Sequence, residues 1–116
     1  MISCIENILA LRAFWSFDRT LHDFYSNFNG RGNVGPKFIS PGYNGHGACL
    51  WLNRTLMQSV SILPPPFFNI PNSSFTFEVW VYPNELYYQD ENSFNTILVQ
   101  CQAMSVRKCL HLTIYE

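Results

Sequence analysis

The sequence predicts an all-β protein, folded as a β-sandwich or a β-barrel. The first observation is a series of short runs in which apolar and polar side chains alternate, separated by clusters of Gly, Pro and Asn. The second is the aromatic content, 16% of 116 residues, because large flat side chains suit pleated, half-buried surfaces. No segment shows a helical period with caps. Many short strands joined by turn-rich connections are typical of sandwiches and barrels.

In the first half of the chain we expect strands at 11–17, 48–52 and 57–63. Every second side chain of the first of these is apolar, which places those side chains on one face. Residues 18–47 are dense in Asn, Gly and Pro, and this segment is too long for a hairpin turn, so we expect it to cross one end of the sandwich. The three prolines at 64–66 end the third strand because proline donates no ladder hydrogen bond.

The clearest strand pattern covers residues 74–82. Both of its faces are largely apolar, which is typical of a central strand. One face carries Phe75, Phe77, Val79 and Val81, and the other carries Thr76, Glu78, Trp80 and Tyr82. A polar loop follows at 84–95, and segments 95–100 and 110–115 are expected to form a hairpin.

The length fits one domain, which we expect at 11–116 after an N-terminal extension at 1–10. Hydrophobic residues make up 47% and charged residues 13% of the chain, and the net charge is −1. No basic cluster is present for nucleic acid or for anionic lipid. No apolar run approaches the roughly 18 residues that span a bilayer. Nucleic-acid binding and direct membrane insertion are therefore not expected.

Three features favour an extracellular or cell-surface location. Charged residues are few, two N-glycosylation sequons begin at Asn53 and Asn72, and the chain has four cysteines. The cysteines form no C-x-x-C pair, so a zinc site is not expected. Each sequon lies beside turn-forming residues, where a glycan could be solvated. Residues 1–15 lack the basic start and the cleavage site of a signal peptide. The cysteines are Cys4, Cys49, Cys101 and Cys109.

Several sequence blocks follow one another in the order of a known family. The most specific block is SFTFEVWVYP, preceded by LRAFWSFDRTLHD and PGYNGHGACLWLNRT and followed by NTILVQCQ and CLHLTIYE. In this order they resemble the laminin-G-like branch of the concanavalin A-like lectin/glucanase superfamily. The resemblance implies an antiparallel jelly-roll β-sandwich. The Trp-x-His strand and Tyr-x-Asp-Gly turn that follow in the family are missing, so the resemblance implies an incomplete sandwich that self-associates through exposed strand edges.

The resemblance also implies a non-catalytic recognition or adhesion module that binds carbohydrate or extracellular protein. The alternative is a purely structural spacer in a larger cell-surface protein. A remnant glycan hydrolase is disfavoured, because such enzymes need two carboxylates flanking the sugar bond. The Glu-x-Asp-x-x-Glu strand motif of those hydrolases is absent, Glu78 stands alone, and Asp90 and Glu91 are adjacent in a loop. We therefore expect no enzymatic activity.

A disulfide between Cys101 and Cys109 is expected across the C-terminal hairpin. If these residues face each other, Leu98 faces Leu112, and opposed residues of antiparallel strands lie within disulfide range. The alternative is two unpaired thiols at strand ends. Cys49 is expected to be a small buried hydrophobe on its strand.

Two further groups of polar residues are candidate sites. Asp18 and Asp23, with nearby asparagines, could offer oxygen ligands to Ca²⁺, and the alternative is that they accept backbone N–H groups in turns. No other cofactor is expected. A ligand-binding loop is the second candidate, because aromatic faces stack on sugars while carboxylates and amides bind hydroxyls. Its residues are Tyr87, Tyr88, Asp90 and Asn92.

Residues 30–35 spell G-x-G-x-x-G, the pattern of dinucleotide-binding proteins. That site requires a preceding strand and a following helix, whose N-terminus binds the pyrophosphate. Here Pro36 follows and no helix pattern does. We therefore interpret these glycines as turn residues.

Overall fold

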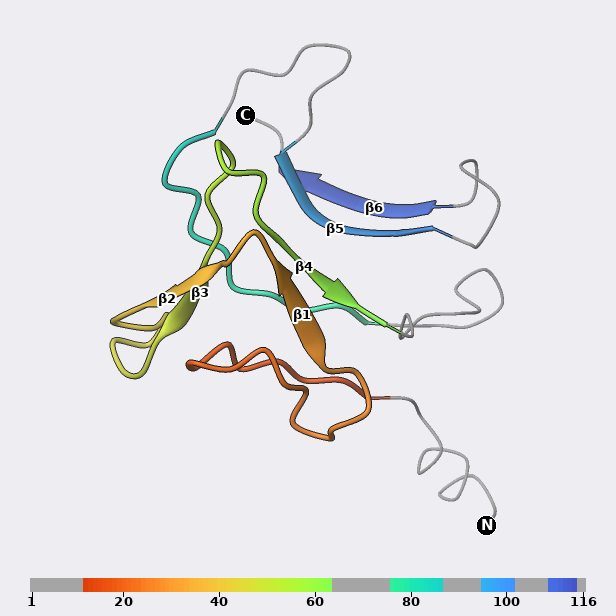
Figure 1. Ribbon diagram of the computed structural model, residues 1–116, viewed down its shortest axis with the longest axis horizontal. Helices are drawn as coiled ribbons and strands as arrows, with labels where there is room; N and C mark the ends of the chain where they lie inside the picture. The colour runs from red at the N-terminus through yellow and green to blue at the C-terminus, as the bar shows by residue number, and fades with distance from the viewer. Residues whose placement is uncertain (1–11, 64–75, 87–94, 102–108, 115–116) are drawn as a thin grey trace. The chain divides into compact units, whose positions relative to one another are not determined.

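The computed structural model describes residues 12–63, 76–86, 95–101 and 109–114. These residues contain six strands and no helix, which confirms the all-β class (Figure 1). The strands form three antiparallel pairs. They are β1 (Gly30–Asn33), β2 (Lys37–Ile39), β3 (Cys49–Trp51), β4 (Ser59–Ile62), β5 (Asn95–Cys101) and β6 (Cys109–Ile114). The chain divides into two compact units, Met1–Pro66 and Phe67–Glu116. Of the three described pairs, two lie in the first unit and one in the second.

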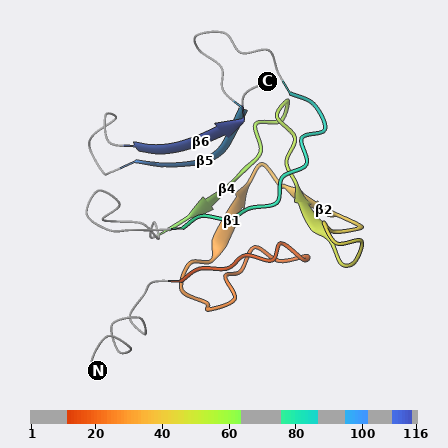
Figure 2. The same ribbon diagram turned by 180° about the vertical axis from the view of Figure 1, so that it is seen from behind.

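The first unit contains two nested strand pairs. β1 pairs with β4 in the register Gly30↔Ile62 to Asn33↔Ser59. The hairpin of β2 and β3 lies between them in the sequence. Opposite views show the strands of each pair side by side (Figures 1 and 2). Gln58 links the two pairs, because its side-chain amide donates to the carbonyl oxygens of Val34 and Gly35, both at 2.9 Å.

The expectation that residues 18–47 form only a turn-rich crossing is wrong, because β1 and β2 lie inside this segment. Glycine has little preference for strands, so β1 carries no strand signal of its own. Close packing explains its glycines: a Cβ at Gly30 would lie 2.7 Å from Val60 Cγ1 and 3.0 Å from the carbonyl oxygen of Leu21. At Gly32 a Cβ would lie 2.7 Å from the ring of Pro36. Gly30 and Gly32 are therefore strand residues rather than turn residues, whereas Gly35, with φ of 60°, lies in the turn between β1 and β2 as predicted. No helix follows them in residues 34–63.

The strand expected at 11–17 is also absent, since described residues 12–17 belong to no ladder. Backbone N–H and C=O groups of this segment instead form hydrogen bonds with a side chain and with isolated backbone groups outside any ladder. The N–H of Phe14 donates to the carboxylate of Asp23, and the carbonyl of Phe14 accepts from the N–H of Phe24. The chain then turns through Phe17 and Arg19 with φ values of 55° and 57°, which no extended strand adopts.

The other strand predictions of the first unit are confirmed. β3 lies within the expected segment 48–52, and β4 within 57–63. Cys49, however, is half-buried rather than fully buried, and its thiol is free. Its Sγ lies 3.8 Å from the carbonyl oxygen of Pro41.

The second unit contains the predicted C-terminal hairpin. β5 and β6 pair in the register Leu98↔Leu112, with Cys101 opposite Cys109 and a shift between Thr96 and Leu98. The two cysteines form the expected disulfide, which closes the hairpin across a sequence separation of 8. Local pairing and alternation thus place these residues as the sequence predicts.

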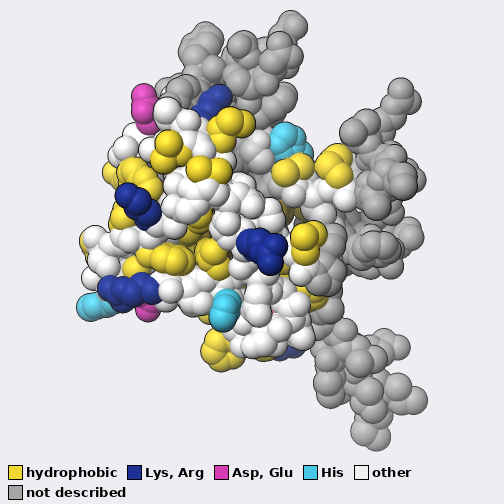
Figure 3. All heavy atoms as spheres, viewed as in Figure 1, with side chains coloured by type: hydrophobic (Ala, Val, Ile, Leu, Met, Phe, Trp, Pro, Cys, Tyr) yellow, Lys and Arg dark blue, Asp and Glu magenta, His cyan; other side chains and the backbone are white. Residues whose placement is uncertain are grey.

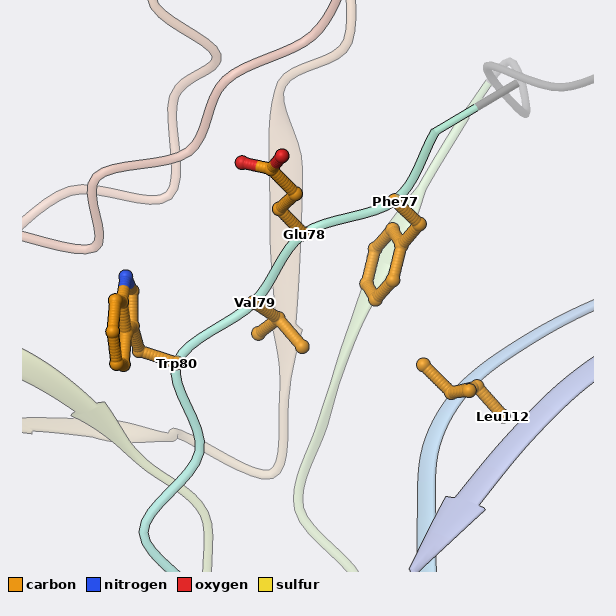
Figure 4. A pocket seen from close by; sticks show the side chains of 5 residues that line it. All are labelled: Phe77, Glu78, Val79, Trp80 and Leu112. Atoms are coloured by element: carbon orange, nitrogen blue, oxygen red, sulfur yellow. The ribbon is translucent and has the colours of Figure 1, made fainter.

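The central strand expected at 74–82 is not formed in the described residues 76–82, which carry no strand assignment. Their alternation is nevertheless preserved, because Phe77 and Val79 lie on one side of the backbone and Glu78 and Trp80 on the other (Figure 4). A strand requires a repeated ladder with a neighbour, and none of the described strands pairs with this segment. Trp80 is accordingly 80% exposed and Tyr82 90% exposed.

Few described side chains are fully buried. Phe28 and Ala48 are the buried apolar residues, and Asp23 is the buried charged residue, all in the first unit. The two-layer core of a jelly roll is thus not seen among the described residues, and that finer architecture stays a proposal.

Candidate functional site

The loop at 14–28 is organised around the carboxylate of Asp23, which is 2% exposed. Its Oδ1 accepts the N–H of Phe14 at 2.8 Å. Its Oδ2 accepts the N–H groups of Asn27 and Phe28, both at 3.2 Å. The backbone N–H of Asp23 itself donates to Asn29 Oδ1 at 3.0 Å. One side chain thereby connects both ends of the loop.

Two further hydrogen bonds hold the loop together. The N–H of Phe24 donates to the carbonyl of Phe14 at 2.8 Å. The indole N–H of Trp15 donates to the carbonyl of Phe28 at 2.7 Å. Buried donors and acceptors that lose their partners are costly, so these bonds stabilise this conformation of the loop.

This loop presents three aromatic side chains to solvent, which we call the aromatic cluster: Phe14, Phe24 and Tyr25. Their exposed fractions are 55%, 76% and 46%. The ring of Phe24 lies 6.4 Å from that of Phe14 and 5.4 Å from that of Tyr25, both edge to face. Such geometry is favourable for aromatic pairs, so the cluster is a defined surface rather than three separate side chains.

Burial raises the pKa of the Asp23 carboxyl, but hydrogen bonds from the backbone N–H groups of Phe14, Tyr25, Asn27 and Phe28 lower it. The net result is a pKa below the ordinary value of 3.8. The pKa of Asp23 is therefore lower in the folded than in the unfolded protein. On acidification the unfolded chain binds a proton at this carboxyl before the folded protein does, so the free energy of unfolding decreases as pH falls through the folded-state pKa.

We therefore expect the Asp23 contribution to stability to be constant above about pH 5 and to fall below about pH 4. Urea midpoints measured from pH 7 to pH 2.5 check this. The Asp23→Asn variant should show a smaller acid dependence than the wild type. Equal acid dependence of the two proteins would contradict the assignment.

Asp18 occupies a second turn, where its Oδ1 accepts the N–H of Ala48 at 3.0 Å and lies 3.4 Å from the guanidinium of Arg19. A Cβ at Gly47, which has φ of 61°, would lie 3.0 Å from this carboxylate. Asp18 and Asp23, the candidate calcium ligands, thus both accept backbone N–H groups. This is the alternative to calcium binding that the sequence offers for them. Among the described residues, no group of three or more His, Cys, Asp or Glu could hold a metal ion.

In the second unit an open hollow of about 380 Å³ lies beside the segment 76–86. Phe77 and Val79 point toward Leu112 of β6, while Glu78 and Trp80 point away from it (Figure 4). The lining is mostly apolar and holds a single carboxylate, so it offers no paired acid and base for hydrolysis.

The other sequence-predicted sites are placed as follows. Tyr87, Tyr88, Asp90, Asn92 and the sequon at Asn72 lie outside the described residues. The sequon residue Asn53 is half-buried, and its Oδ1 accepts the N–H of Thr55 at 2.9 Å.

Sequence reasoning missed the aromatic cluster. The sequence pattern places Phe14 in a strand and Phe24-Tyr25 in a long connection. A usable signal was present, because Asp23 directly precedes two aromatic residues in a segment rich in Asn, and Asp and Asn bind nearby backbone groups in turns. Basic side chains do not mark another binding surface on the face shown in Figure 3, where Lys and Arg are scattered singly.

Comparison with known proteins identifies no relative: no family model matches the sequence, and no curated protein or solved structure is significantly similar to it. The laminin-G-like assignment therefore rests on the sequence blocks alone. In the residues that the structure describes, no helix is long and apolar enough to cross a membrane.

Proposed function

We propose that this protein is a non-catalytic extracellular recognition module that binds a carbohydrate or protein ligand. The observation that supports this proposal is the aromatic cluster, which is exposed and yet fixed by the buried Asp23 carboxylate. Binding residues are commonly found on loops that a rigid scaffold positions. Exposed apolar side chains gathered in one place mark interaction surfaces more often than single ones do.

Aromatic rings suit this role for a chemical reason. They bury a large area with few rotatable bonds, and their faces stack on the apolar face of a sugar ring or on a partner's side chains. Tyr25 adds a hydroxyl group that can bind a ligand oxygen. Aromatic residues are accordingly frequent among those that contribute most to binding energy.

The cell-surface location belongs to the same proposal. The disulfide of Cys101 and Cys109 supports it, because such bonds persist in oxidising compartments. Self-association and the incomplete jelly roll are also proposed. The exposure of Trp80 and Tyr82 on an extended segment supports both, since unpaired apolar strands associate readily.

The test is binding of the disulfide-bonded chain to arrays of glycans and of purified extracellular proteins. For any ligand found, we expect Phe24→Ala and Tyr25→Ala each to weaken binding by about tenfold, the usual scale for an aromatic contact residue. Tyr43→Ala is the matched control, because this exposed aromatic residue lies outside the cluster. Binding that is unaffected by the cluster variants, or equally weakened by Tyr43→Ala, would reject the cluster as the binding surface. Absence of any ligand would favour the structural spacer.

A further inference from the structure

One face of the β1–β4 ladder carries only polar side chains. Arg31 pairs with Ser61 across the ladder, and Asn33 pairs with Ser59. Because side chains alternate along a strand, these four residues share one face. Figure 1 shows the two strands side by side. We call this surface the polar face; it consists of Arg31, Asn33, Ser59 and Ser61.

The opposite face of the ladder packs against the protein, which fixes the direction of the polar face. A Cβ at Gly30 would lie within 3.3 Å of Leu21 Cβ, and one at Gly32 would lie 3.4 Å from Leu21 Cδ1. Val60 is half-buried beside Gly30, whereas Arg31, Ser59 and Ser61 are exposed. The polar face is therefore directed to solvent.

The hydrogen bonds of this face leave its donors pointing outward. The side-chain amide of Asn33 donates to Ser59 Oγ at 3.0 Å and to Ser61 Oγ at 2.7 Å. An amide has two N–H hydrogens, so both are used, and each serine hydroxyl acts as an acceptor. The two O–H hydrogens are then free for a partner outside the protein. If the side-chain amide of Asn33 is turned by 180°, its oxygen accepts both serine O–H groups. Its own two N–H groups then point outward, so the face still has two free donors.

Arg31 adds a positive charge beside these donors. Its guanidinium has no hydrogen-bond or ion-pair partner in the described part of the chain. A guanidinium offers five N–H donors in a planar fork. The polar face thus combines an uncompensated charge with two outward donors on adjacent strands.

We propose that the polar face binds a tetrahedral oxyanion, either sulfate or phosphate, as a free ion or as an ester. The fork of Arg31 binds two of its oxygens, and the hydroxyls of Ser59 and Ser61 donate to the others. A carboxylate has its two oxygens in one plane with the Arg31 fork, whereas a tetrahedral oxyanion has further oxygens outside that plane that the serine hydroxyls can reach. The site is separate from the aromatic cluster and does not depend on the recognition role proposed above.

The test is an NMR titration of the folded, disulfide-bonded protein at constant ionic strength. Sulfate and phosphate should shift the amide signals of Asn33, Ser59 and Ser61 in a saturable manner, whereas acetate and chloride should shift them less. A sulfate ester and a phosphate ester of a small alcohol then distinguish free ion from ester, according to which binds more tightly. No saturable shift with any of these anions would overturn the proposal.

Variants separate binding from folding. Arg31→Gln should weaken anion binding by at least about tenfold, because charge-assisted hydrogen bonds are lost. Ser61→Ala should weaken it by about tenfold, the lower value for one hydrogen bond to a charged group. Lys37→Gln on β2 removes the same charge elsewhere and should leave binding unchanged. Equal losses in Arg31→Gln and Lys37→Gln would show a general charge effect and reject the site.

Discussion

Replacing Asp23 with alanine will lower the free energy of unfolding by about 3 kcal/mol or more. The substitution removes the acceptor for the backbone N–H groups of Phe14, Asn27 and Phe28. The site is 2% exposed, so water replaces the carboxylate poorly and these donors remain unsatisfied. Urea unfolding followed by tryptophan fluorescence measures the effect, because Trp15 lies in the same loop.

Asp18→Ala is the matched control for this change. Its carboxylate is also a backbone acceptor, but it is half exposed, and the backbone N–H that it accepts is that of Ala48. We expect this variant to lose about 1 kcal/mol or less. An Asp23→Ala protein with the stability of the Asp18→Ala protein would show that burial of the carboxylate does not matter. Loss of ligand binding in Asp23→Ala would be attributed to the loop only if the protein is folded at the temperature of the assay.

The second large effect concerns the disulfide of the C-terminal hairpin. Replacing both Cys101 and Cys109 with serine should lower the free energy of unfolding by about 2–3 kcal/mol, because the closed loop no longer restricts the unfolded chain. The bond joins residues that are directly opposed in the ladder, so its removal leaves the hairpin with two strands and no covalent link. A two-stranded hairpin is only marginally stable without other support.

Urea midpoints of three samples check this prediction. The wild type under reducing conditions and the double variant should coincide, and the oxidised wild type should be more stable than both. Cys49→Ser is the control, since Cys49 is a free thiol and its replacement should not alter the response to reductant. Alkylation of all four cysteines in the non-reduced, denatured protein would contradict the disulfide.

The C-terminal hairpin shows how far local sequence can be interpreted. Its two strands are separated by a short connection, and both alternate apolar and polar residues. The register that places Leu98 opposite Leu112 could be obtained by aligning the two cysteines. Contacts between residues near in sequence leave a pattern in the sequence itself, and for this reason the hairpin and its disulfide were predicted together.

The pairing of β1 with β4 left no such pattern. Gly30 lies opposite Ile62, more than thirty residues later in the numbering. Half of β1 is glycine, a residue that favours turns when it is judged by local propensity alone. Glycine is found at position 30 of this strand because Val60 and Leu21, which the fold brings close to it, leave no room for a Cβ atom.

The candidate site shows the same division. From the sequence, Asp18 and Asp23 were equivalent, since either could bind a metal or accept backbone N–H groups. The structure separates them, because Asp23 is enclosed by the loop whereas Asp18 stays half exposed. The aromatic cluster depends on this enclosure, and its members come from both ends of the loop.

The sequence by itself determined the all-β class, the positions of β3 to β6, the alternation of side chains in residues 77–80 and the disulfide partner of Cys101. The tertiary structure alone decided which segments pair, which carboxylate is buried and which aromatic side chains meet at the surface. The physical reason is that alternation and turn propensity act between neighbours in the chain, whereas ladder pairing and burial depend on residues that only folding brings together.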